Sequence, residues 1–345
     1  DILFRTGPAP GTQASMGHMH SDWLSVCARV GGRPVIVDAG TYSYRAAAHR
    51  WPESAPPWRH YLRGPEAHNC VFFEGIDPLG EPPTGDFRAN AVDTRIVTKA
   101  VFSSDCFCWF EGVYDGSPVL EGYKRGVILV SGAFALVYDL FPPGINPAWA
   151  GFQFSSDVEV SQGDSRIVAS MAGEEALNLI ACPATAELTC LSGSTGPMGG
   201  WESQRYGEVK FAPQVRLNFS DGIRASAYLI TSCNTMEWSI QTLQNPDGCL
   251  HLEICGQDET HFIILNPSNS EWGPKPDILQ CDADYCWLKT RAGEPVSLIA
   301  TNVTRISAFQ GSDALFDARE TWVEMNWSST GCHTRTGSGR PAQGI

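Results

Sequence analysis

Histidine and aspartate residues gather near the start of this 345-residue chain in a pattern that suits a metal ion. Five of the eight histidines fall between residues 18 and 68, among them His18 and His20 at positions i and i+2. These two side chains share a face if the segment is an extended strand. Asp38 follows eighteen residues after His20, and His68 follows thirty residues after Asp38. We expect His20, Asp38 and His68 to converge, because two imidazoles and a carboxylate form a ligand set that zinc accepts, with a fourth position left for water.

An interpretation without a metal stays open on the same residues. A His-x-His pair is short, and such pairs commonly serve as hydrogen-bonded groups of the surface or core. Asp38 precedes Ala39 and Gly40, and an aspartate at the end of a strand is a common turn residue. The spacing alone therefore does not decide between a zinc site and a turn.

The elements that must position these residues read as β-strands. Residues 23–30 and 34–38 predict a hairpin around Gly31 and Gly32, and residues 42–66 form a long loop with a local surplus of basic residues. Alternating apolar, β-branched and aromatic residues recur downstream without a convincing helical period. The expected strands are residues 71–74, 91–100, 106–114, 123–130, 134–139, 152–160 and 176–181.

We therefore predict an all-β fold, a large antiparallel β-sandwich over residues 1–240. Shorter and more polar strands at 249–254, 261–265, 286–290, 296–301 and 321–327 predict a smaller C-terminal β region over residues 241–330. Residues 331–345 are rich in Gly, Ser and Arg, and we expect a flexible tail there.

Composition excludes some classes of function. The net charge of −14 argues against nucleic-acid binding through phosphate neutralisation, although a local basic cluster still permits an acidic glycan. No apolar run reaches the roughly 20 residues that span a bilayer. The twelve cysteines include no Cys-x-x-Cys pair, and we favour small buried thiols over a disulfide framework. The chain starts at Asp1, already strand-like and without a signal peptide, so we expect a piece of a longer protein.

Four sequence blocks resemble the heparinase II/III-like polysaccharide lyases and the related oligoalginate lyases. They are Gly-His-Met-His-Ser-Asp-Trp-Leu-Ser at 17–25, Val-Asp-Ala-Gly-Thr-Tyr-Ser-Tyr at 37–44, Trp-Arg-His-Tyr-Leu-Arg at 58–63 and Ala-His-Asn-Cys-Val at 67–71. Weaker similarities follow near 122–127 and 200–207, and Gln153 stands where the family has a histidine. The resemblance covers residues 1–235 well and the remainder loosely.

The resemblance implies a C-terminal antiparallel sandwich of the supersandwich type that works with an N-terminal (α/α) toroid absent from this chain. It implies β-elimination on a uronic acid of an acidic polysaccharide or oligosaccharide, such as a glycosaminoglycan or alginate. It assigns Zn²⁺ to His20, Asp38 and His68, mainly to hold the strands that face the cleft. His18 would face the cleft as the base or as a group that neutralises the substrate carboxylate.

Other residues of these blocks are expected to contact substrate. Arg63 and Arg59 offer bidentate carboxylate binding, Tyr44 would line the cleft, and Asn69 would cap the site. Solvated loop charges and ordinary packing explain the same residues without a substrate. A non-catalytic carbohydrate-binding module with structural zinc is the alternative function, and a scaffold for exopolysaccharide handling is a third. A lyase of this kind is expected in the periplasm or outside the cell, with the cytoplasm left open.

Overall fold

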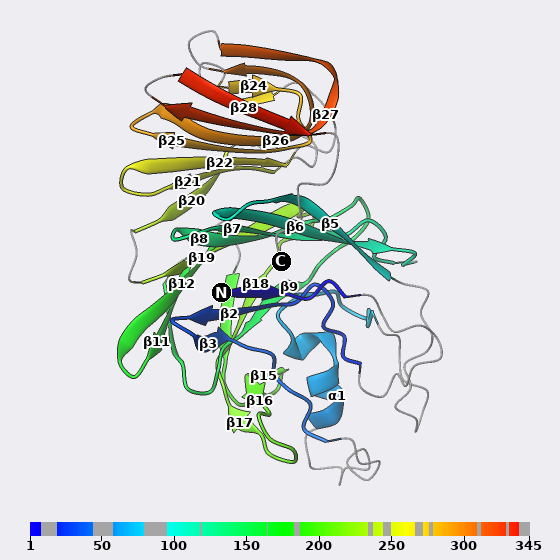
Figure 1. Ribbon diagram of the computed structural model, residues 1–345. Helices are drawn as coiled ribbons and strands as arrows, with labels where there is room; N and C mark the ends of the chain where they lie inside the picture. Colours follow the sequence, from blue (N-terminus) through cyan, green and yellow to red (C-terminus); the bar gives the residue numbers. More distant parts are fainter. Residues whose placement is uncertain are drawn as a thin grey trace. The chain divides into compact units, whose positions relative to one another are not determined.

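The computed structural model describes residues 1–7, 19–43, 58–78, 95–117, 119–163, 165–182, 187–233, 237–243, 250–265, 272–275, 279–308, 312–328 and 331–337. These residues are almost all in antiparallel strands, so the predicted all-β class is confirmed (Figure 1). The described helical segments are α1 (Trp58–Arg63) and the 3₁₀ turn η3 (Pro65–Ala67). No helix within the described ranges has the length and apolar character needed to cross a membrane.

The chain divides into two compact units, neither of which is one continuous stretch of sequence. The first comprises Asp1–Thr98, Gly112–Arg125 and Asp139–Arg224, and the second comprises Lys99–Glu111, Gly126–Tyr138 and Ala225–Ile345. Four strands contribute residues to both units: β5 (Arg95–Ser103), β6 (Phe107–Asp115), β7 (Lys124–Val130) and β8 (Phe134–Leu140). The domain boundaries 1–240, 241–330 and 331–345 stay a prediction.

The first unit carries the N-terminal hairpin and several antiparallel sheets. One sheet has the order β1 (Ile2–Phe4), β2 (Val26–Val30), β3 (Arg33–Ile36). A second has the order β13 (Glu187–Leu191), β18 (Gln214–Asn218), β9 (Trp149–Gln153), β4 (Val71–Phe72). The remaining strands of this unit are β10 (Glu159–Gln162), β11 (Arg166–Met171), β12 (Glu174–Cys182), and the pairs β14 (Ser194–Thr195) with β15 (Met198–Gly199) and β16 (Trp201–Glu202) with β17 (Lys210–Phe211).

The predicted hairpin is confirmed, with a shorter first strand than the sequence suggested. Gly31 and Gly32 have φ of 55° and 78°, the left-handed pair that a two-residue turn between twisted strands requires. Strand β2 starts at Val26 rather than residue 23, because Leu24 takes a left-handed φ of 61° that ends regular extension. The segment with His20 therefore lies ahead of the strand and not on it.

The second unit is also antiparallel. Its parts of β5 to β8 form a sheet with β19 (Ala225–Ser232) in the order β19-β8-β7-β6-β5. The other sheet has the order β20 (Ser239–Leu243), β21 (Leu250–Cys255), β22 (Glu259–Leu265), β25 (Tyr285–Arg291), β26 (Glu294–Ala308), β24 (Leu279–Cys281), β23 (Trp272–Lys275), with β27 (Ser312–Ser328) beside β26 and β28 (Gly331–Gly337) beside β27.

Buried side chains follow the two-residue period of the strands. In β11, Ile167, Ala169 and Met171 are buried while the residues between them are only partly covered. In β8 every residue is buried, which shows that both faces of this strand are covered. The long apolar run that includes β7 and β8 thus forms two strands and a turn, as the sequence predicted.

Candidate metal centre

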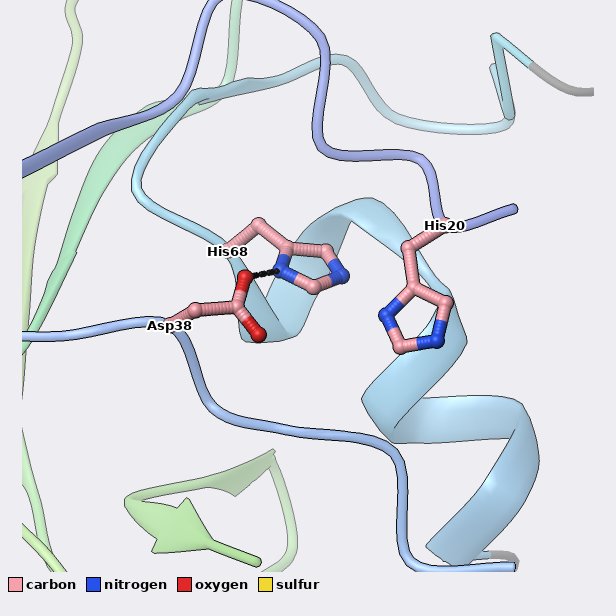
Figure 2. Close-up of side chains that lie close together, drawn as sticks. All are labelled: His20, Asp38 and His68. Carbon is pink, nitrogen blue, oxygen red and sulfur yellow. Dashed lines mark hydrogen bonds and ion pairs between the residues drawn. The ribbon is translucent and has the colours of Figure 1, made fainter. Parts of the chain in front are cut away.

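Three segments that are distant in sequence bring His20, Asp38 and His68 together. One ligand atom of each residue lies within 4.8 Å of the other two, and the imidazole ring centroids are 5.2 Å apart. Nδ1 of His68 lies 2.9 Å from Oδ2 of Asp38. Figure 2 shows the three side chains pointing toward one another from three separate segments. This convergence is the one that the sequence predicted.

The local structure that delivers these residues differs from the prediction. His20 lies in irregular chain, Asp38 lies two residues beyond β3, and His68 follows the 3₁₀ turn η3. The expected loop at 42–66 contains helix α1, because Tyr61 and Leu62 bury their side chains against Ala39 and Trp201 and so stabilise a short helix. Pro65 at the start of η3 supplies the fixed φ that begins the next turn, and His68 caps it.

Thr41 and Arg59 form a second layer behind His20. Nε2 of His20 lies 3.2 Å from Oγ1 of Thr41 and 3.1 Å from Nη1 of Arg59, and Arg59 also donates to Oγ1 of Thr41. The other ring nitrogen of His20 faces His68 and Asp38 (Figure 2). Because a guanidinium only donates, Nε2 accepts from Arg59, and Thr41 and Arg59 together fix the orientation of the ring from the side away from His68 and Asp38.

The charges around the cluster suit metal ligation. Burial, together with the neighbouring His68, lowers the pKa of His20 to about 3, so its imidazole is neutral. Burial alone would raise the pKa of Asp38, but His68 outweighs it and holds the pKa of this carboxyl below its ordinary value. Burial lowers the pKa of His68, but the carboxylate of Asp38 raises it by more, so the net shift is upward. A bound cation would release the proton of His68, because only neutral imidazole coordinates a metal.

The unpaired polar atoms of these three residues also fit a bound cation. Nε2 of His68 is buried and has no hydrogen-bond partner among the described residues. Oδ1 of Asp38 accepts from the backbone N–H of Gly40 at 2.9 Å, and Oδ2 lies against Nδ1 of His68, so both contacts fix the carboxylate and each oxygen keeps a second lone pair. Two imidazole nitrogens and this carboxylate therefore converge as a donor set that suits a cation such as zinc.

Other predicted site residues are placed as follows. Arg59 and Arg63 are 2% and 4% exposed, and Nη1 of Arg63 lies 3.4 Å from Asp77. Asn69 donates to the carbonyl of Val37 at 2.8 Å and accepts from the N–H of Gln153 at 2.5 Å. Asn69 thereby links the backbone at Val37 to the backbone at Gln153. His18 and Tyr44 lie outside the described residues, and the roles of all these residues in substrate binding or catalysis stay predictions.

The sequence reasoning missed a buried ion pair that anchors the cluster. Arg125 and Asp139 are fully buried and make two contacts, Nε to Oδ1 at 2.8 Å and Nη2 to Oδ2 at 3.0 Å. Tyr123 donates to the same carboxylate at 2.7 Å. Nη1 of Arg125 donates to the carbonyls of Asn69 at 2.8 Å and Leu24 at 3.2 Å. An arginine and an aspartate inside two apolar strands were the available signal, since buried charges are nearly always paired.

Comparison with known proteins decides the family. The model of the heparinase II/III-like C-terminal family matches residues 1–220. The chain belongs to this family. The heparinase II/III-like match spans the whole cluster, with His20, Asp38 and His68 inside it. No curated protein matches the chain.

Solved structures share the heparinase-like fold. The heparan sulfate lyase HepC from Pedobacter heparinus has a TM-score of 0.52 at 16% identity and covers 74% of this chain. The heparinase III product of BT4657 has a TM-score of 0.56 at 13% identity and covers 84%. A further heparinase III has a TM-score of 0.52 at 14% identity. The chain spans 37% of the HepC structure and 39% of the two heparinase III structures, so these likenesses describe its fold and not a whole enzyme.

Proposed function

We propose that this chain is the β-sandwich part of a polysaccharide lyase that cleaves uronic-acid glycans by β-elimination. The observation that carries the proposal is the convergence of His20, Asp38 and His68 in a member of the heparinase II/III-like family. Its solved relatives bear the names of heparan sulfate lyase and heparinase, which makes a glycosaminoglycan the first substrate to test. Alginate, another uronate polymer, is the second.

In this proposal the cluster holds a zinc ion that supports the wall of a glycan cleft. Zinc supplies a fixed cross-link between chain segments and, with an open position, a Lewis acid. The residues of this chain do the positioning: Asp38 and His68 keep a charge-assisted hydrogen bond, and Thr41 orients His20. His18, two residues before His20, is the group that we assign to the cleft.

The chemistry requires a base and a means to stabilise negative charge. The base removes the proton next to the uronate carboxylate, and the resulting enolate carries two negative charges. The bond from the adjacent carbon to the glycosidic oxygen then breaks as a C=C double bond forms, and an acid gives that oxygen a proton. Fixed cations or hydrogen-bond donors at the carboxylate supply the largest stabilisation of that state. Histidine is the side chain most often used as a general base, and we assign that role, or neutralisation of the carboxylate, to His18. A helical toroid domain upstream would supply the opposite wall and the remaining groups.

The test is an assay of the full-length protein on heparan sulfate and alginate, because each elimination creates an unsaturated uronate that absorbs in the ultraviolet. We expect absorbing products from at least one polymer and their loss in His18→Ala. The matched control is His60→Ala, since His60 is exposed on α1 and belongs to no part of the proposed site. Binding of these glycans without any unsaturated product would favour the carbohydrate-binding module instead. The proposal also places the protein in the periplasm or outside the cell, where such polymers are met.

A further inference from the structure

An exposed aromatic ring lies at the edge of a hollow in the first unit. Phe211 in β17 is 67% exposed, although it belongs to a paired strand and neighbours the buried Trp201. A single exposed apolar side chain is common on soluble proteins, so the case for Phe211 depends on what holds the ring and on what lies beside it.

The ring of Phe211 is held in place on two sides. Trp201 meets it edge-on, with ring centroids 5.0 Å apart and an interplanar angle of 61°. The backbone at Gly193 approaches the ring so closely that an added Cβ would lie 2.4 Å from Cδ1, and Gly193 has a left-handed φ of 63°. Only glycine satisfies both conditions. The ring is thus a fixed platform with much of its surface left to solvent.

The hollow beside this platform combines apolar and charged groups. It has a volume of about 390 Å³ and is lined by Ser156, Asp157, Val209, Lys210 and Phe211. That volume is in the lower range of small-molecule sites. The N–H of Ser156 donates to Oε2 of the buried Glu202 at 2.8 Å, which fixes this wall. Oγ of Ser156 has no hydrogen-bond partner among the described residues.

The platform is joined to the segment that carries Asp38. The N–H of Ser203, next to β16, donates to the carbonyl of Ala39 at 2.8 Å, and Ser203 forms a parallel bridge with Gly40. Aromatic rings continue the connection: Trp58 lies 4.5 Å from Trp201 between centroids and 6.4 Å from Tyr42. The hollow and the candidate metal centre are therefore parts of one packed structure within the first unit.

We propose that this hollow is a glycan subsite that binds one pyranose ring of an acidic polysaccharide, with the sugar stacked on Phe211. The C–H face of a pyranose is apolar and fits an aromatic ring, whereas its rim carries hydroxyls. Asp157 accepts hydrogen bonds from those hydroxyls, and Lys210 attracts the carboxylate of the same or the next sugar. The choice of an acidic glycan rests on the proposed function. The stacking of a sugar on Phe211 does not depend on that function.

The test measures binding by titration calorimetry with the full-length protein. The probes are an unsulfated tetrasaccharide of alternating uronic acid and hexosamine, and its carboxyl-reduced form, which cannot undergo the elimination. We expect Phe211→Ala to weaken binding of both probes by about tenfold, as loss of a central aromatic contact does. Lys210→Met should weaken only the carboxylated probe, by roughly fivefold, since the reduced probe offers no charge to Lys210.

Two further variants serve as controls. Phe110→Ala removes another aromatic side chain, 37% exposed and outside the hollow, and should leave both affinities unchanged. Phe211→Tyr keeps the ring and should keep binding. Unchanged affinity of Phe211→Ala for both probes would overturn the subsite, even if the protein cleaves uronate polymers. Weakened binding in a protein that yields no unsaturated product would uphold the subsite and refute the lyase.

Discussion

Nη1 of Arg125 donates a hydrogen bond to the backbone carbonyl of Asn69, the residue that follows His68, at 2.8 Å. The same guanidinium is neutralised by Asp139 and also reaches the carbonyl of Leu24. The buried guanidinium of Arg125 therefore fixes the backbone at Asn69, one residue after His68, and at Leu24, four residues after His20. The placement of His20 and His68 thus depends on a group outside the candidate metal centre.

We expect Arg125→Met to unfold the first unit more easily and to weaken metal binding. The buried carboxylate of Asp139 would lose the guanidinium that neutralises its charge, which costs about 3–5 kcal/mol in comparable pairs. Chemical denaturation measures the loss of unfolding free energy, and metal analysis measures occupancy. Arg95→Met is the matched control, because Arg95 pairs with Asp115 while 70% exposed and should cost no more than about 1 kcal/mol. Equal stability of the two variants would contradict the anchoring role.

Zinc should stabilise the wild-type chain and have no such effect on His68→Gln. A ligand that binds only the folded state stabilises it by about 2.7 kcal/mol when its free concentration is about 100-fold above the dissociation constant. Thermal unfolding with added zinc and with a chelator measures this difference. His60→Gln, on the exposed side of α1, should respond like the wild type. A zinc response that persists in His68→Gln would remove His68 from the ligand set.

Thr41→Val tests the layer behind His20. Valine has nearly the shape of threonine but lacks the hydroxyl whose oxygen lies 3.2 Å from Nε2 of His20. We expect metal affinity to fall by about 10- to 100-fold, as it does on loss of comparable outer-shell partners. Competition with a chromophoric chelator gives the affinity. Thr301→Val removes a buried hydroxyl that has no partner in the described part of the chain and should change nothing.

The second unit should lose stability in mild acid through His261. Burial, followed by the charge of Lys289, lowers the pKa of His261 to about 4. The indole N–H of Trp287 donates to Nδ1 of His261 at 3.1 Å, a contact that requires this nitrogen to be unprotonated. Unfolded histidine titrates near 6.5, so the unfolded chain binds a proton between pH 6.5 and 4 that the folded chain does not.

The unfolding free energy should therefore fall by up to about 3 kcal/mol as pH falls from 6.5 to 4. Denaturation at a series of pH values measures the slope, which should flatten in His261→Gln. The exposed His333 on β28 provides the control, and His333→Gln should keep the slope of the wild type. An identical pH profile in His261→Gln and the wild type would exclude His261 as the source.

Much of the fold could be predicted because strand periodicity is local. The expected strands 123–130 and 134–139 are observed as Lys124–Val130 and Phe134–Leu140, with a turn between them. Helix α1 was not predicted because its six residues are too few to show the periodic spacing of apolar residues typical of a helix. Its stability comes from the contact of Tyr61 and Leu62 with residues distant in the chain, which no local pattern contains.

The ligand cluster could be predicted from residue types, but its support could not. His20, Asp38 and His68 belong to sequence blocks with a recognisable order, so their convergence followed from the family resemblance. The contacts of Arg59 with Thr41 and of Arg125 with Asn69 join residues 18 and 56 positions apart. Such pairings depend on the complete packing of the first unit, and a single sequence gives no pairwise information about them.

The division of the chain has a practical consequence for dissection experiments. Residues 99–111 and 126–138 belong to the second compact unit, yet the first unit resumes after each of them. No single cut in the chain yields either unit whole. A truncation near residue 240 would discard most of the second unit while leaving residues 99–111, 126–138 and 225–240 of it behind. Isolated halves would lack part of the packing on which any metal or glycan binding depends, so point substitutions in the uncut polypeptide are the sound way to separate the contributions of the two parts.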